Sequence, residues 1–417
     1  MLDMKFIREN PEIIKKNVER RGKDPVMVEN LIVLDKELRE LSKTIDELRA
    51  KKNTPKGKPT PEEMKQLLEV KEEIDNLEKY REEVGNNFKK LILAIPNLIA
   101  DDVPDGKDDS ENKEIFKKGD IPQYDFPVKD HLQIGQELDL LDFDRGAKVA
   151  QSGFYYLKNE LVLLDLALQR YAMDKLTAKG FIPIITPDMA KDTICAGTGY
   201  NPRGEEKQMF NIADEEMSLV GTAEVTLGGF HADEILLEQD LPKKYVGLSH
   251  CFRVEKGGYG KYSKGLYRVR QFSKVEMFVL CKPKDSEKYH QELLANEQEI
   301  WNELNIPYHV VMQCTGDMSS ASMKTYDVEA WMPGRGNYGE VTSTSNTGDY
   351  QSRRLHIRYK DNQSGENIFV HMLNGTAVNN SRFPLTILEN GQQANGDIKI
   401  PEVLWQYTGF EVIKKKN

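Results

Sequence analysis

The stretch from Cys251 to Val279 carries side chains that could act on a charged substrate. A predicted strand, CFRVE, is followed by a glycine-rich basic loop, KGGYGKYSKG, and a second predicted strand, LYRVRQFSKVEMFV. Side chains alternate between the two faces of a strand. One face of the first strand should therefore present Ser249, Cys251, Arg253 and Glu255, and one face of the second should present Arg268, Arg270, Phe272, Lys274, Glu276 and Phe278. Such a surface could bind a phosphate, an amine and a base, although a solvent-exposed hairpin is the commoner explanation of so charged a face.

The composition sets broad limits. With 417 residues, 39% hydrophobic and 30% charged, the chain is long enough for two or three domains. Its net charge of −10 argues against general binding of nucleic acids or membranes, but a local basic patch could still bind RNA. Four scattered cysteines, without metal-ligand or disulfide spacing, indicate a cytoplasmic protein. We see no signal peptide, and no apolar run approaches the ~20 residues of a membrane span.

Several familiar motifs of nucleotide binding and covalent catalysis are missing. The sequence contains no P-loop, no G-x-G-x-x-G between a strand and a helix, and no nucleophile elbow. A nucleotide bound near Cys251–Val279 would therefore need another kind of site.

Two apolar heptad seams lie upstream of this region. They consist of Leu31, Leu34, Leu38, Leu41, Ile45 and Leu48, and of Leu67, Val70, Ile74, Leu77, Val84, Phe88 and Leu91. Thr60 and Glu63 form a capping box that starts the second helix, after the turn NTPKGKP. The pattern predicts an antiparallel coiled-coil arm over about 27–94, roughly 40–50 Å long at 1.5 Å per residue.

Basic residues cluster at the predicted tip of this arm. They are Arg49, Lys51, Lys52, Lys56 and Lys58. A basic tip could hold a phosphate backbone, whereas a solvated loop or a coiled coil that binds a partner protein explains the arm equally well.

The organisation expected from these patterns is an α+β chain with an N-terminal helical domain over 1–100, an acidic linker over 101–127 and a mixed domain over 128–417. Strands in runs with flanking helices, such as the amphipathic segment 160–179, predict an antiparallel sheet covered by helices.

The motifs together resemble the class II aminoacyl-tRNA synthetases and, within them, the seryl-tRNA synthetase family. GFIPIITP is similar to motif 1, FRVE with GLYRVRQFSKVEMF to motif 2, and NGTAVNNSRFPLTILEN to motif 3. Thr222-Ala223-Glu224, GEVTSTSNTGDYQSRR from Gly339, and IPNLIADDVPDG are similar to segments of the serine-specific members. The resemblance covers nearly the whole chain and implies ATP-dependent attachment of serine to its tRNA, with the tRNA for selenocysteine as a further acceptor, by a cytoplasmic homodimer.

The resemblance also implies roles for individual residues. Arg253 and Arg382 would be the catalytic arginines, on the α- and γ-phosphates, and Glu340 with Ser343 would hold Mg²⁺. Glu255, Val269 and Phe272 would contact the nucleotide, with Val254, Val341 and Thr342 beside them. Thr222, Ala223, Glu224, Arg253, Glu276 and Thr376 would bind serine. The arm and the loop lysines Lys261 and Lys264 would contact tRNA.

This sequence departs from the family pattern around Arg382. Asn379-Asn380-Ser381 before it and Phe383-Pro384 after it replace a run of small apolar residues, and Trp405-Gln406 replaces Arg-Pro. Two other interpretations remain open: a catalytically inactive paralogue whose coiled coil docks a partner, and a ligase that charges a carrier protein. The presence of Arg253, Glu276, Glu340 and Arg382 disfavours the first, and the complete arm disfavours the second.

Overall fold

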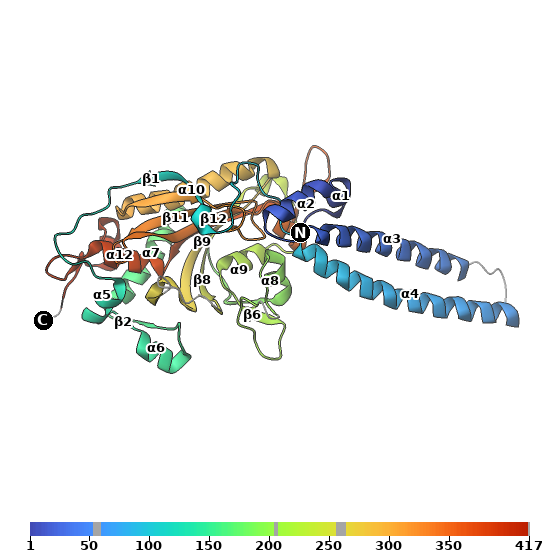
Figure 1. Ribbon diagram of the computed structural model, residues 1–417, viewed down its shortest axis with the longest axis horizontal. Coiled ribbons are helices and arrows are strands. Elements are labelled where there is room, and N and C mark those ends of the chain that lie inside the picture. The colour runs from blue at the N-terminus through green and yellow to red at the C-terminus, as the bar shows by residue number, and fades with distance from the viewer. Residues whose placement is uncertain (53–59, 204–206, 256–263, 416–417) are drawn as a thin grey trace. The chain divides into compact units, whose positions relative to one another are not determined.

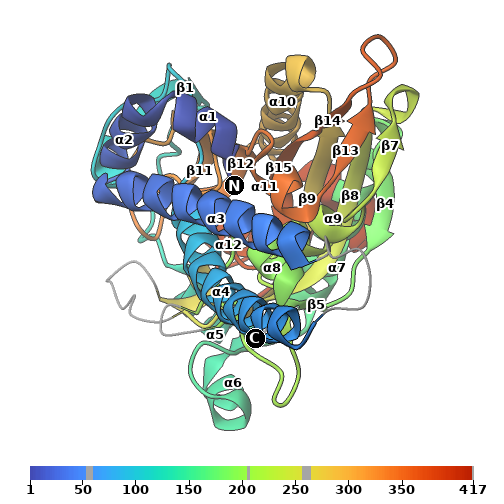
Figure 2. The same ribbon diagram turned by 90° about the vertical axis from the view of Figure 1, so that its right-hand side faces the viewer.

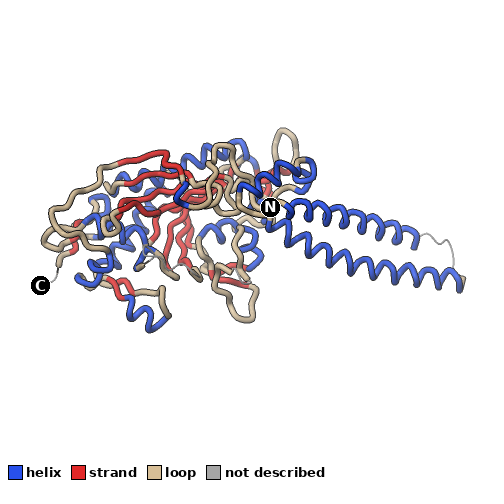
Figure 3. Tube along the Cα trace, viewed as in Figure 1, coloured by secondary structure: helices blue, strands red, loops and turns tan. Residues whose placement is uncertain are grey.

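The computed structural model describes residues 1–52, 60–203, 207–255 and 264–415, in two compact units, Met1–Leu98 and Ile99–Asn417. In its described residues the first unit consists of helices, and the strands lie in the second unit (Figure 3). The fold is thus the mixed α+β class expected, with an N-terminal helical arm.

The first unit is built around two long helices that lie side by side (Figure 1). Its elements are α1 (Met4–Glu9), α2 (Pro11–Arg20), α3 (Val26–Lys52) and α4 (Pro61–Ala94). Ile45, Leu48 and Ile74 form a buried cluster between α3 and α4, and Thr60 makes both hydrogen bonds of the predicted capping box. The heptad seams therefore form the antiparallel hairpin that the sequence predicted.

The centre of the second unit is an eight-stranded sheet. In spatial order its strands are β1 (Lys113–Lys118), β10 (Tyr308–Met312), β11 (Lys324–Met332), β12 (Asn337–Asn346), β15 (His371–Asn379), β9 (Gln271–Cys281), β8 (Lys243–Phe252) and β4 (Ile182–Ile185). Neighbouring strands are antiparallel except β4 and β8, which are parallel.

Helices cover both faces of this sheet. The larger core lies against α7 (Glu160–Ala178), α10 (Ser286–Leu304) and α12 (Arg382–Gly391). A second core lies against α9 (Ala223–Gly229) and α11 (Tyr350–Leu355), with α8 (Asp192–Thr198) packed on both of these helices. Along β9, Val275 and Met277 enter the first core and Phe278 the second, so the even positions of this strand face away from α7 and α10.

The remaining elements are short. Figure 2 shows the three-stranded sheet of β14 (Asn367–Phe369), β13 (Arg358–Lys360) and β7 (Ile235–Leu237). The others are α5 (His131–Glu137), α6 (Phe143–Ala150), α13 (Trp405–Thr408), β2 (Leu141–Asp142), β3 (Tyr156–Leu157), β5 (Met189–Lys191), β6 (Met217–Leu219), β16 (Ile398–Lys399) and β17 (Val412–Ile413).

Two expectations about the second unit need correction. The segment 101–127 is not a free linker, because it lies in the second unit and its strand β1 pairs with β10 at the sheet edge. The predicted strand pair is also shorter than expected, since β8 ends at Phe252 and β9 begins at Gln271. Glu255 has a φ of +47°, a left-handed conformation that ends the strand alternation of residues 251–255.

Two further properties concern the environment of the chain. All four cysteines are free thiols and are buried. In the part of the chain that the structure describes, no helix combines the length and the apolar character needed to cross a membrane.

Candidate active site

A cleft of about 930 Å³ opens on the sheet face opposite α7 and α10. Three neighbouring strands supply its floor: β9 with Phe272, Lys274 and Glu276, β15 with Asn374 and Thr376, and β12 with Glu340 and Ser343. The even positions of β9 that the sequence placed on one face, from Phe272 to Glu276, thus line one cleft.

One end of the cleft is a buried acidic pocket. Glu276 is 1% exposed; its Oε2 lies 2.5 Å from the ammonium of Lys274 and accepts a hydrogen bond from the hydroxyl of Thr376 at 3.4 Å. Thr376 is the register partner of Glu276 on β15, so the pairing of the two strands brings these groups together.

Glu224, near the start of α9, is the second acid of this pocket. It accepts hydrogen bonds from the Tyr200 hydroxyl at 2.9 Å and from the Gln351 amide at 2.7 Å. Burial, and then the nearby carboxylate of Glu276, raise the pKa of Glu224 above its usual range. The same burial, with Glu224 beside it, raises the pKa of Tyr200. This end therefore combines two carboxyl groups with hydroxyl and amide donors, a suitable site for a small ammonium-bearing ligand.

Arginines and aromatic rings line other parts of the cleft. The guanidinium of Arg253 lies over the Phe272 ring, 5.1 Å from its centroid, and its Nε donates to the Gly221 carbonyl. Arg382 and Arg335 both lie 4.6 Å from the centroid of the Tyr267 ring. Guanidinium groups bind phosphate oxygens in bidentate fashion and stack on flat rings. These residues could therefore bind a nucleotide.

Arg382 is held at the first turn of α12 by several contacts. Its Nη1 lies 2.9 Å from Glu340 Oε1 and donates to the Glu340 carbonyl, and its Nε donates to the Tyr267 carbonyl. The unusual Asn379 contributes here: its Oδ1 accepts from the Arg382 backbone N–H at 2.7 Å, and its amide donates to the Val341 carbonyl at 2.7 Å. The departure from the family pattern thus supplies hydrogen bonds that link β15, β12 and the start of α12.

Most of the predicted nucleotide and serine residues line the cleft. They are Glu224, Arg253, Glu255, Val269, Phe272, Glu276, Glu340, Val341, Thr342, Ser343, Thr376 and Arg382. Three predicted residues lie outside its lining: Thr222 caps α9 through its hydroxyl, Ala223 packs in the second core, and Val254 is buried with its N–H bonded to the Gln208 carbonyl. Glu255 is ion-paired with Arg268, so its carboxylate already has a cationic partner.

The sequence prediction missed several cleft residues. Lys274 was placed on the correct strand face but was given no role, although alternation with Phe272 and Glu276 was a sufficient signal. Tyr200 and Arg335 lie outside the quoted motifs, and only the folded chain brings them to the cleft. Gln351 lies inside the segment from Gly339 but was given no role, and in the structure it donates to Glu224.

The predicted tRNA contacts are spread over both units. Lys51 and Lys52 are exposed at the end of α3, and Lys264 is exposed before Leu266. Arg49 is engaged with Glu78 at 2.5 Å, so acids of α4 partly offset the basic character of the arm. Lys56, Lys58 and Lys261 lie outside the described residues.

Magnesium requires hard oxygen ligands. Glu340 and Ser343 both line the cleft and supply such atoms. Among the described residues, no group of three or more His, Cys, Asp or Glu side chains is arranged to hold a metal ion. The two residues fit a Mg²⁺ ion that takes its other ligands from substrate phosphates and water.

Comparison with known proteins matches both parts of the chain. The seryl-tRNA synthetase N-terminal domain matches residues 1–99, and the class II core domain of the synthetases for G, H, P, S and T matches residues 209–391. A serine–tRNA ligase of Dictyoglomus turgidum is 48% identical, with 100% of each chain covered, and one of Treponema denticola is 48% identical over 99% of this chain and 100% of its own.

Solved structures agree with these sequence relatives. The seryl-tRNA synthetase of Pyrococcus horikoshii, complexed with ATP, superposes with a TM-score of 0.92 at 40% identity, covering 100% of both chains. The cytoplasmic serine–tRNA ligase of Naegleria fowleri, in complex with AMP, gives 0.86 at 33% identity, covering 100% of this chain and 99% of its own.

Proposed function

The chain belongs to the seryl-tRNA synthetase family of class II, and from this membership we propose how its cleft carries out the ATP-dependent ligation of L-serine to tRNA. The observation that carries the proposal is the convergence of Glu276, Arg253 and Arg382 in one cleft. These three residues supply the charges needed for an amino acid and a nucleotide: a carboxylate for the ammonium, and guanidinium groups for the phosphates.

Serine binds at the acidic end. Its ammonium group lies against the Glu276 carboxylate, and its hydroxyl exchanges hydrogen bonds with the Thr376 hydroxyl or with Glu224. A site built to bond a substrate hydroxyl rejects the analogue that lacks it by ~10⁴-fold or more, because its buried polar groups are then left unpaired. Alanine is therefore excluded by chemistry, whereas threonine must be excluded by size.

ATP occupies the arginine-lined part of the cleft. The adenine stacks on Phe272, the α-phosphate binds Arg253, and the outer phosphates bind Arg382. Glu340 and Ser343 would hold Mg²⁺ here, and the ion would neutralise charge on the phosphates when bound. Arg253 then contacts both the serine carboxylate and the α-phosphate, two anions that must approach each other.

The first step forms a bond between a serine carboxylate oxygen and the α-phosphorus and breaks the bond to the bridging oxygen, so pyrophosphate leaves. In the second, a ribose hydroxyl of the terminal tRNA adenosine attacks the seryl carbonyl, and AMP leaves with the bonding electron pair. Neither step needs a side chain as a covalent nucleophile. The cleft residues act by alignment and by charge stabilisation.

We extend the proposal to a homodimer formed through α7 and β4. Leu163 and Leu166 on α7 are 49% and 56% exposed, and Ile182 and Ile185 on the edge strand β4 are 54% and 80% exposed. Exposed apolar side chains on adjoining elements favour a protein interface. Light scattering should give twice the chain mass, and Ile185→Asp should shift the mass toward the monomer.

The arm is proposed to hold the tRNA by its shape and backbone, as is usual for RNA duplexes. Its exposed Lys51 and Lys52 at the end of α3 support phosphate contacts.

Pyrophosphate exchange into ATP tests the whole proposal. Purified protein with Mg²⁺ should catalyse exchange that depends on serine and not on alanine or threonine at equal concentration. Absence of serine-dependent exchange in folded protein would favour the inactive paralogue with a docking arm.

A further inference from the structure

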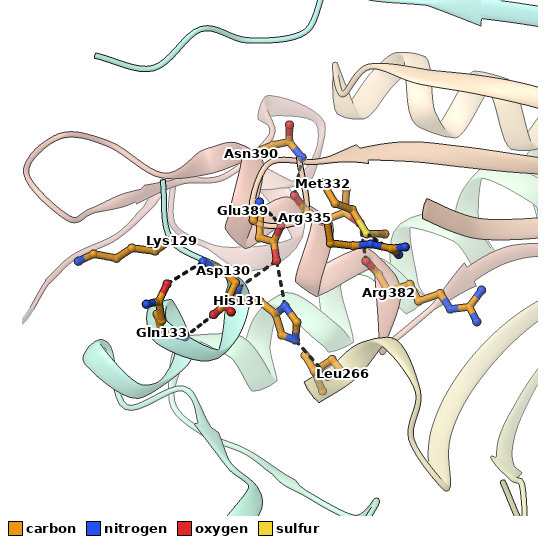
Figure 4. A network of polar contacts seen from close by, with 12 residues as sticks. Lys129, Asp130, His131, Gln133, Leu266, Met332, Arg335, Arg382, Glu389 and Asn390 are labelled. Carbon is orange, nitrogen blue, oxygen red and sulfur yellow. Dashed lines mark hydrogen bonds and ion pairs between the residues drawn. The ribbon is translucent and has the colours of Figure 1, made fainter. Parts of the chain in front are cut away.

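A buried histidine outside the cleft connects three segments that reach the cleft or lie beside it. His131 is the first residue of α5 and is 7% exposed; its partner Glu389, on α12, is 1% exposed. Figure 4 shows the His131 ring between Glu389 and Leu266. None of the steps described above uses His131 or Glu389.

The hydrogen bonds fix the tautomer of this ring. The Leu266 backbone N–H donates to His131 Nε2 at 3.2 Å, so Nε2 must carry a lone pair. The ring proton is then on Nδ1, which donates to Glu389 Oε1 at 2.9 Å. His131 therefore joins a backbone N–H on one side to a carboxylate on the other.

The Glu389 carboxylate accepts two further hydrogen bonds, both from backbone N–H groups. Its Oε1 also accepts from the His131 backbone N–H at 3.0 Å, and its Oε2 accepts from the Gly334 backbone N–H at 2.8 Å. One buried carboxylate thus ties the start of α5 and the turn at Gly334 to α12. Arg335 follows Gly334 directly, and Tyr267 follows Leu266 directly.

The two neighbours meet in the cleft. The guanidinium groups of Arg335 and Arg382 both lie over the Tyr267 ring, and Arg382 Nε also donates to the Tyr267 carbonyl. Arg382 and Glu389 are seven residues apart on α12, about two turns or ~10 Å along the helix, and so project from one side of it. A single helix therefore carries both the phosphate-binding arginine and the carboxylate that anchors its neighbours.

Two glycines lie in close contact with the His131–Glu389 pair. Gly265 has a φ of +65°, and a Cβ built on it would lie 2.2 Å from His131 Nε2. A Cβ on Gly334 would lie 2.9 Å from Glu389 Oε2. Both glycines allow the backbone to approach the His131–Glu389 pair closely enough for its hydrogen bonds.

We propose that His131 is a positioning residue for ATP. By linking Leu266 to Glu389, it sets the Tyr267 ring against Arg335 and Arg382 and so aligns the phosphate-binding side of the cleft. The inference rests on the proposed function for the identity of the ligand. Among the residues that the structure describes, no hydrogen bond joins His131 or Glu389 to the serine end, formed by Glu276 and Thr376.

Two amide substitutions distinguish the hydrogen bond between His131 and Leu266 from the one between His131 Nδ1 and Glu389. In His131→Gln the amide oxygen can occupy the Nε2 position and still accept from Leu266, whereas in His131→Asn the amide can reach only Glu389. One buried hydrogen bond contributes ~1 kcal/mol, so His131→Asn should raise the KM for ATP in the exchange reaction about fivefold. His131→Gln keeps the acceptor for the Leu266 N–H and the backbone N–H bond to Glu389, so it should stay within about twofold of wild type. The KM for serine should change less than about twofold in both variants.

The control is His356→Asn, an exposed histidine with a φ of +55° that asparagine adopts readily; its kinetic constants should match wild type. If His131→Asn does not fold, Gly265→Ala perturbs the same contact from the other side and should give the same selective rise. The proposal is overturned if ATP and serine KM values rise together, if the Gln and Asn variants behave alike, or if neither KM changes. If the wild-type protein shows no serine-dependent exchange, calorimetry can measure its affinity for ATP in the absence of serine. The same selective weakening is then expected in His131→Asn and not in His131→Gln.

Discussion

Asp165 should make the second unit less stable as the pH rises. This residue lies on α7 and is 8% exposed, and its Oδ2 accepts hydrogen bonds from the amides of Gln169 at 3.0 Å and Asn380 at 3.3 Å. Burial raises the pKa of Asp165 from the ordinary 3.8 to about 6, against the opposing effect of the two amide donors. Asp165→Asn replaces the carboxylate with a neutral group of the same shape.

Proton linkage gives the direction and the size of the change in the free energy of unfolding with pH. Between pH 3.8 and about 6 the folded chain retains a proton at Asp165 that the unfolded chain has released, so the free energy of unfolding falls as pH rises through this window. Each tenfold change in a dissociation constant corresponds to ~1.4 kcal/mol, and the loss is therefore about 3 kcal/mol at neutral pH. Asp165→Asn removes the loss, so its advantage over wild type should grow by about 2.5 kcal/mol from pH 4 to pH 7.5.

Urea unfolding followed by tryptophan fluorescence measures this difference, because Trp301, Trp331 and Trp405 all lie in the second unit. The amide protons of the new asparagine add a constant offset, so the test is the slope with pH. Asp174→Asn is the matched control: Asp174 is on the same helix, is 40% exposed and pairs with Arg170, and its loss should cost less than ~0.5 kcal/mol. A difference between Asp165→Asn and wild type that does not vary between pH 4 and 7.5, or that shrinks with rising pH, would refute the reasoning.

Three further outcomes are expected. Arg253→Ala should lower serine-dependent exchange by at least ~100-fold, because the α-phosphate loses its guanidinium; near-normal exchange would show that the motif 2 assignment is wrong. Deleting residues 30–93 should leave the pyrophosphate exchange activity largely intact but reduce tRNA aminoacylation severely. If the deletion variant still aminoacylated tRNA at the wild-type rate, the arm would not be the element that binds tRNA. Thr376→Val should reduce the preference for serine over alanine about tenfold in exchange kinetics, with the loss confined to serine.

The arm could be predicted closely from the sequence because its determinants are local. The capping box at Thr60 correctly predicted where α4 begins. The heptad spacing correctly placed Ile45 and Ile74 in the core between the two helices of the arm. Strand β1 could not be predicted in the same way. Its sequence KEIFKK is exposed along its whole length, and its place in the sheet depends on β10, nearly two hundred residues later in the chain.

The part of the site that lies on the single strand β9 could be predicted from the sequence. Alternation placed Phe272, Lys274 and Glu276 together, and the motif resemblance added Arg382 from a distant segment. Contacts between side chains far apart in the sequence, such as the hydrogen bond from Tyr200 to Glu224, could not be predicted from local sequence patterns. Asn379 looked like an irregularity in the sequence, and only its bonds to Arg382 and Val341 explain it.

The burial of all four thiols has a practical consequence. Burial raises the pKa of Cys195 to about 11 and that of Cys281 to about 12, so these side chains are neither exposed nor ionised at neutral pH. Maleimide dyes should therefore react slowly with the native protein. A Lys52→Cys substitution at the exposed end of α3 would then be a selective attachment point for a fluorophore. The proposed binding of tRNA at the arm could be tested with it, without removing any natural cysteine.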